Sequence, residues 1–177
     1  MDFLRDFLGN PPMSTPSNTP TPSPQGRESD ADLADATILL VDDNPQNLEL
    51  LQAYLEELPC KLVQAADGDE ALKAVEKSQP DLILLDIMMP KMSGFQVCSK
   101  LKNSPATSEI PVVMVTALNE VSDVERAVDC GADDFLTKPV HRLELLTRTR
   151  SFLRLRKLRK QLNSTLAELR SLKDGRR

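Results

Sequence analysis

The sequence predicts an α/β fold in which a parallel sheet is covered by helices on both faces. Short apolar runs of strand length alternate with helical patterns between residue 37 and about residue 150. The runs at 38–41 and 82–85 are apolar throughout, as strands buried on both faces must be. Five strand–helix units of this size are expected to form one parallel sheet with right-handed crossovers.

The individual elements follow from these patterns in chain order. The expected strands are TILLVD at 37–42, KLVQAA at 61–66, DLILLD at 81–86, PVVMVT at 111–116 and ADDFLT at 132–137. Apolar residues at helical spacing predict helices at 45–58, 69–78, 95–103 and 121–129. Asn44 followed by Pro45 predicts the N-cap and first turn of the first helix.

The first 35 residues differ from this middle region in composition. They begin MDFLRDFLGN, which places four apolar residues on one face of a short helix, and continue in a Pro/Ser/Thr-rich stretch. Such a stretch buries too little apolar surface to offset its ordering entropy, so we expect 1–35 to be a disordered tail. Its amphipathic segment is either a docking peptide for a partner or a terminus without function.

The end of the chain predicts one long helix. No Gly or Pro occurs between Val140 and Gly175, and we expect 151–177 to extend beyond a globular domain at 36–150. The a and d positions of a heptad are occupied by Leu155, Leu158, Leu162, Thr165, Leu169 and Leu172. This spacing favours a parallel coiled coil and a homodimer, the alternative being a helix that frays beyond Arg156.

Composition excludes several classes of protein. No apolar run approaches the roughly 20 residues that cross a bilayer, and charged residues interrupt the N-terminal apolar segment, so it is not a signal peptide. Cys60, Cys98 and Cys130 are far apart, which supports neither a disulfide framework nor a zinc site. We therefore expect a cytoplasmic protein.

Polar side chains follow four of the five predicted strands. Asp42 and Asp43 follow the first strand, while Asp86, Thr116 and Lys138 come at the ends of the third, fourth and fifth. Because the carboxyl ends of parallel strands share one edge, these side chains should lie together. Three carboxylates there would repel unless a cation such as Mg²⁺ shared them. A carboxylate can attack phosphorus to give an acyl phosphate, so the pattern predicts phosphoryl transfer.

Four segments carry a family resemblance. VDDNPQN, LLDIMMPKMSGF, VVMVTA and GADDFLTKP occur in an order and at a spacing that resemble the receiver domain of two-component response regulators, over residues 36–150. The resemblance implies a flavodoxin-like, doubly wound sheet with strand order 2-1-3-4-5. It also implies a phosphorylated switch and not an enzyme, with a histidine kinase or a phosphotransfer protein as donor.

The resemblance assigns the phosphoacceptor and the metal ligands. Asp86 would take the phosphoryl group. Mg²⁺ would be bound by Asp43, Asp86 and the backbone carbonyl of Met88. Asp42 would reach the metal through a water molecule.

The resemblance also assigns the residues that sense the phosphoryl group. Thr116 and Lys138 would contact its oxygens, and the peptide bond between Lys138 and Pro139 would be cis. Phe135 would occupy the aromatic position that turns inward when Thr116 moves toward the phosphate.

Two apolar residues predict a long-lived phosphorylated state. Met88 lies two positions after Asp86, and Leu118 lies two positions after Thr116. Neither side chain can orient a water molecule for attack on the acyl phosphate, so we expect a lifetime of minutes or longer.

The output of the switch is open to three interpretations. No helix-turn-helix or cyclase motif follows the domain, which favours a stand-alone regulator acting through protein contacts. Alternatively, the chain is the regulatory front of a longer enzyme such as a diguanylate cyclase. A third reading uses the twelve Lys and Arg residues after residue 140, against three acids, to bind nucleic acid or an anionic membrane. With aromatic residues at only 3%, base stacking is disfavoured, and we consider this third reading unlikely.

Overall fold

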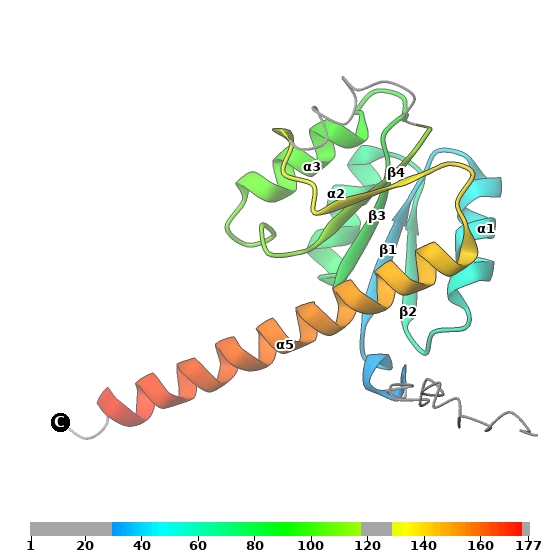
Figure 1. The fold of residues 1–177 in the computed structure, drawn as a ribbon. Helices are drawn as coiled ribbons and strands as arrows, with labels where there is room; N and C mark the ends of the chain where they lie inside the picture. Colours follow the sequence, from blue (N-terminus) through cyan, green and yellow to red (C-terminus); the bar gives the residue numbers. More distant parts are fainter. Residues whose placement is uncertain (1–29, 118–128, 175–177) are drawn as a thin grey trace, which may run out of the picture.

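The computed structural model describes residues 30–117 and 129–174 and contains a five-stranded parallel sheet between two layers of helices (Figure 1). The strands are β1 (Thr37–Val41), β2 (Lys61–Ala65), β3 (Leu82–Asp86), β4 (Val112–Thr116) and β5 (Asp134–Thr137). They lie in the order β2-β1-β3-β4-β5, which confirms the predicted topology. Each predicted strand is present, shortened by one or two residues.

Helices cover both faces of this sheet. They are the 3₁₀-helix η1 (Asp30–Leu33) and the α-helices α1 (Pro45–Leu55), α2 (Gly68–Ser78), α3 (Gly94–Asn103) and α5 (Arg142–Asp174). The Asn44 side chain accepts a hydrogen bond from the Gln46 amide, as the predicted N-cap requires. Helix α1 ends three residues earlier than predicted, since Pro59 disfavours helical backbone at Leu58. The helix expected at 121–129 lies, except for its last residue, outside the described residues.

The core consists of two apolar layers that share the sheet. Ile38 and Leu40 of β1 pack in the layer beneath α1 and α5, whereas Leu39 and Val41 pack in the layer beneath α2 and α3. Successive side chains of a strand point to opposite faces. A strand that is buried on both faces must therefore be apolar at every position, which is the pattern that identified β1 and β3.

The folded body begins earlier than the sequence predicts. Residues 30–35 were expected to belong to a disordered tail, but Asp30–Leu33 forms η1, and Leu33 is buried in the same apolar cluster as Leu153 of α5. An acidic segment with one leucine has no local pattern that indicates this, because its partners lie more than a hundred residues away. The remainder of the predicted tail, with its apolar segment, lies outside the described residues.

Helix α5 has two parts with different surroundings. It spans 33 residues, close to the length predicted. Its first turns bury Leu145, Leu146, Thr149 and Leu153 against the sheet. Its later turns project past the edge of the body (Figure 1), and their leucines are exposed.

Gly94 at the start of α3 is expected to tolerate no side chain. A Cβ atom there would lie 2.1 Å from the carbonyl oxygen of Asp86, which belongs to a buried strand and cannot move freely. We predict that Gly94→Ala destabilises the fold by about 1–3 kcal/mol or more in urea denaturation, although alanine favours helix. Lys100→Ala, at an exposed position of the same helix, should change stability little, and equal effects would contradict the steric argument.

Candidate functional site

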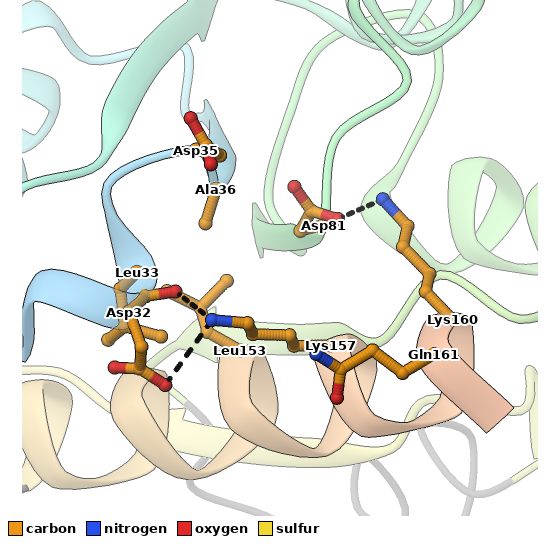
Figure 2. A pocket seen from close by; sticks show the side chains of 9 residues that line it. All are labelled: Asp32, Leu33, Asp35, Ala36, Asp81, Leu153, Lys157, Lys160 and Gln161. Carbon is orange, nitrogen blue, oxygen red and sulfur yellow. Dashed lines mark hydrogen bonds and ion pairs between the residues drawn. The ribbon is translucent and has the colours of Figure 1, made fainter.

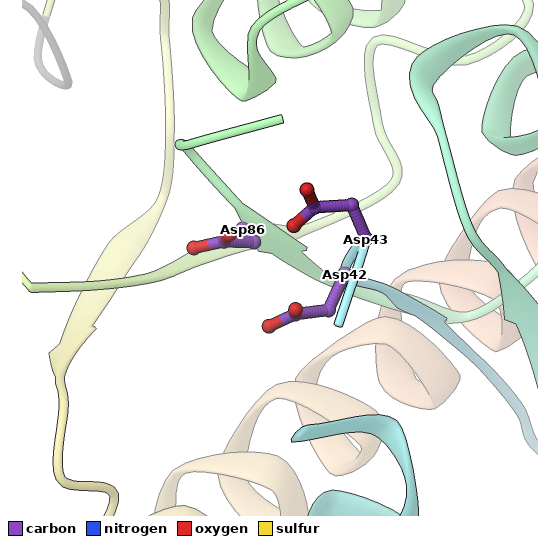
Figure 3. A group of neighbouring side chains, drawn as sticks. All are labelled: Asp42, Asp43 and Asp86. Atoms are coloured by element: carbon purple, nitrogen blue, oxygen red, sulfur yellow. The ribbon is translucent and has the colours of Figure 1, made fainter. Parts of the chain in front are cut away.

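Three carboxylates meet at the carboxyl edge of the sheet. Asp42 and Asp43 follow β1, and Asp86 ends β3, which lies next to β1 with Val41 opposite Leu85. One carboxylate oxygen from each aspartate lies within 4.8 Å of the others (Figure 3). The parallel pairing of two adjacent strands thus brings together the three acids that the sequence singled out.

The ammonium group of Lys138 lies between two of these carboxylates. Its Nζ atom is 2.8 Å from Oδ2 of Asp42 and 3.1 Å from Oδ1 of Asp86. The backbone amide of Lys138 donates to the carbonyl of Thr116 at 2.8 Å, and the following bond to Pro139 is cis, as the family resemblance implies. One cation therefore balances part of a cluster that carries three negative charges.

Asp42 is buried and held by donors from the start of α1. Oδ1 accepts from the backbone amide of Asn44 at 2.9 Å, and Nδ2 of Asn47 is 3.0 Å from both carboxylate oxygens. Asn47 belongs to the segment VDDNPQN, in which the sequence alone indicated no role for it. Its position in the first turn of a helix that starts at the sheet edge is the signal that could have identified it.

Burial and charge shift the titration of the two central groups. Burial raises the pKa of the Asp86 carboxyl above its ordinary value, since desolvation outweighs the hydrogen bond from Lys138 that favours the charged form. Burial also opposes the charged form of Lys138, but the hydrogen bonds to Asp42 and Asp86 outweigh it and raise the pKa of the ammonium. The ammonium of Lys138 thus keeps its proton, while the negative charge of the Asp86 carboxylate is only partly offset.

The remaining predicted residues surround this cluster. Thr116 is buried at the end of β4, one residue beyond Val115, which pairs with Asp86 across the strands. The side chain of Met88 is 74% exposed, in the loop that follows Asp86. Phe135 on β5 is 38% exposed and so is not packed inward in this structure.

The donor set suits a hard divalent cation. Asp43 is exposed, Asp42 and Asp86 are buried, and each of the three can offer a carboxylate oxygen to one ion. Oxygen ligands of this kind, with room for water, are those that Mg²⁺ prefers. The residues present therefore fit the metal that the family resemblance implies.

Comparison with known proteins identifies the family. Residues 38–150 match the family described as the response regulator receiver domain, and the chain belongs to that family. Response regulator PleD from Caulobacter vibrioides is 47% identical over 119 residues, which are 67% of this chain and 26% of that protein. The DNA-binding dual master transcriptional regulator RpaA from Synechocystis is 44% identical over 66% of this chain and 48% of its own length.

Solved structures support the same assignment. The signal receiver domain of a signal transduction histidine kinase from Syntrophus aciditrophicus aligns with a TM-score of 0.64 and 38% identity, covering 67% of this chain and 89% of that one. Chemotaxis protein CheY4 from Vibrio cholerae aligns with a TM-score of 0.61 and 28% identity, covering 67% and 98%. The chain spans a quarter to a half of the length of the curated relatives described above. Among the described residues, no helix has the length and apolar character needed to span a bilayer.

Asp86→Asn is expected to stabilise the fold at neutral pH in the absence of divalent cations. The substitution removes one buried charge from a cluster with more carboxylates than cations, so the free energy of unfolding should rise by on the order of 1 kcal/mol. Thermal unfolding in EDTA measures it. Glu76→Gln, which removes an exposed charge from α2, should leave Tm unchanged; a lower Tm for Asp86→Asn would contradict the prediction.

Proposed function

We propose that this chain is a phospho-accepting switch of two-component signalling, with Asp86 as the phosphoacceptor. The observation that carries the proposal is the geometry around Asp86. Its carboxylate lies in an oxygen-rich cluster with Asp42 and Asp43 and is bonded to the ammonium of Lys138. Each of these groups has a function in phosphoryl transfer to a carboxylate.

The proposed reaction transfers a phosphoryl group from a phosphohistidine of a histidine kinase or phosphotransfer protein. A carboxylate oxygen of Asp86 attacks phosphorus, the N–P bond breaks with its electron pair on the imidazole, and an acyl phosphate forms. Lys138, which now bridges Asp42 and Asp86, would turn to the incoming phosphoryl oxygens. The Thr116 hydroxyl would donate a hydrogen bond to another of these oxygens.

Mg²⁺ is the proposed cofactor, held by Asp43, Asp86 and the Met88 carbonyl. When bound, it offsets the negative charge that the carboxylates and the phosphoryl oxygens bring together. The hydrogen bonds that Asp42 accepts from Asn44, Asn47 and Lys138 occupy much of its capacity. This favours a contact of Asp42 with the metal through water and not directly.

Phosphorylation is proposed to act through Thr116 and Phe135. The Thr116 hydroxyl is buried next to the strand that ends in Asp86, and a move toward the phosphoryl group would leave space behind it. Phe135, which is half exposed on the neighbouring strand β5, could turn into that space. The surface that it leaves would then differ between the two states.

Incubation with a small acyl phosphate donor and Mg²⁺ should add one phosphoryl group per chain. We expect the label on wild type and on Asp69→Asn, an exposed control, and none on Asp86→Asn, which has no nucleophilic carboxylate. Intact mass and phosphate-affinity electrophoresis measure it. Labelling of Asp86→Asn at the wild-type level would place the phosphoacceptor elsewhere.

The phosphorylated state should persist for minutes or longer after the donor is removed. Met88 offers no polar group beside the acyl phosphate, and Leu118, the second apolar residue of this argument, lies outside the described residues. Met88→Asn should shorten the lifetime, because an amide can orient an attacking water. Decay of wild type within seconds in Mg²⁺ alone would contradict this.

The proposed output is homodimerisation through α5. The five leucines at its a and d positions are 47% to 68% exposed. Together they form an apolar row that burial against a partner would stabilise. In a parallel pair, Glu168 at a g position would face Lys173 at an e position of the second copy, an opposite-charge contact that favours this orientation. A second copy of the chain is thus the occupant that fits this face.

Other outputs have less support. Within the part of the chain that the structure describes, seven basic residues of α5 form ion pairs with acids, namely Arg142, Arg148, Arg150, Arg154, Arg156, Lys157 and Lys160. A nucleic acid or an anionic membrane would have to compete for them.

A role as the regulatory front of a longer enzyme remains an alternative, because the relatives are longer than this chain. Location in the cytoplasm stays a prediction.

Replacement of the central leucines should abolish the dimer. We expect Leu162→Asp/Leu169→Asp to sediment as a monomer at concentrations where the wild type, with its phosphoryl mimic beryllofluoride, is dimeric. Asn163→Asp, outside the a and d positions, is the control. Equal masses for the wild type and the leucine variant would rule out the α5 interface.

A further inference from the structure

The segment before the sheet is tied to α5 by ion pairs that start at Asp30. Oδ2 of Asp30 lies 3.0 Å from Nε of Arg150, and Oδ1 lies 3.4 Å from Nη2 of Arg154. These groups are 24% to 29% exposed, so they are partly shielded from water. One carboxylate thus links two successive turns of the long helix to η1.

The next turns of α5 continue this connection (Figure 2). Nζ of Lys157 donates to the backbone carbonyl of Asp32 at 2.7 Å and lies 3.7 Å from its carboxylate. Lys160 pairs with Asp81, whose other oxygen accepts from the backbone amide of Thr37 at the start of β1. The contacts therefore run along α5 from Arg150 to Lys160 and reach the sheet.

Apolar packing alone does not account for this junction. Leu33 is buried against the core, but an open pocket of about 230 Å³ remains between η1, the residues just before β1 and α5. Asp32, Lys157 and Lys160 line that pocket. The apolar contact of Leu33 is thus supplemented by ion pairs around the rim of this pocket.

A further ion pair links α5 to the segment that precedes β4. Nη1 of Arg156 lies 3.1 Å from the carboxylate of Glu109, just before β4. Among the described residues, Lys160 is the last residue of α5 with an ion pair to the body. The leucine face, formed by the a and d leucines from Leu155 onward, overlaps these contacts at its start and lies beyond them from Leu162.

Charge at the start of the leucine face would oppose the pairing of two copies. In the parallel arrangement, Arg154 at a g position faces Arg159 at an e position of the second helix, which is a repulsive contact. Asp30 lies against Arg154 and reduces its effective charge. The acids of η1 thus lie where they can lessen this repulsion.

We propose that Asp30 and Asp32 form an electrostatic clasp with Arg150, Arg154 and Lys157 that orients α5 and neutralises the basic start of its dimerisation face. The proposal rests on the dimer of the preceding section for its effect on assembly. Its effect on the helix within one chain stands independently. Since the matched family domain begins at residue 38, the clasp is an addition on its N-terminal side.

The test compares Asp30→Asn/Asp32→Asn with a charge-matched control, Glu49→Gln/Glu76→Gln, both in the full chain with Mg²⁺ and beryllofluoride. Sedimentation should show a dimer weakened roughly fivefold to tenfold at low salt for the clasp variant only. Added salt should restore its dimer toward the wild-type level, because salt screens the exposed repulsion. Equal dimer affinity of the wild type and the clasp variant at low salt would overturn the effect on assembly.

Hydrogen exchange of the α5 backbone separates the clasp from the dimer. In the monomeric Leu162→Asp/Leu169→Asp background, loss of Asp30 and Asp32 charge should speed exchange at residues 150–160. A charge swap, Asp32→Lys with Lys157→Asp, should restore protection relative to Asp32→Lys alone. If the wild type never dimerises but exchange still responds, the proposed output fails and the clasp stands. Unchanged exchange in the clasp variant would overturn the clasp.

Discussion

The ammonium of Lys138 between Asp42 and Asp86 is the interaction on which the rest of the site depends. Three carboxylates at one edge of a sheet repel each other. The ammonium of Lys138, ion-paired with two of them, lowers this repulsion. Its position follows from the sheet order, because β5 lies at the far edge and its lysine must reach back across β4. The negative charge that remains uncompensated is what the proposed Mg²⁺ would offset.

Much of this arrangement could be predicted from the sequence because its causes are local. A strand buried on both faces must be apolar throughout, and a polar residue at its end then marks the edge of the sheet, as Asp42 and Asp86 do. What could not be predicted depends on contacts between distant residues. The donation from Asn47 to Asp42 needs the angle at which α1 leaves the sheet, and the order of η1 needs α5, whose arginines lie about 120 residues away.

The basic residues and the leucines of helix α5 each have a pattern that is compatible with more than one structural role. Its basic residues allowed a face that binds nucleic acid or an anionic membrane, yet in the structure most of those near the body are paired with acids of the same chain. Apart from the exposed Leu143, its leucines are core residues up to Leu153 and exposed from Leu155 onward. The helix thus connects the apolar layer that it shares with α1 to an exposed apolar face, which is the face proposed for dimerisation.

Calorimetric titration of Mg²⁺ into the unphosphorylated chain tests the central claim most directly. The claim is that Asp42, Asp43 and Asp86 carry more negative charge than Lys138 offsets, so that the cluster binds a divalent cation. The account predicts saturable binding of one Mg²⁺ per chain, lost in Asp43→Asn and retained in the exposed control Asp69→Asn. Absence of saturable binding, or binding that is unaffected by Asp43→Asn, would contradict it.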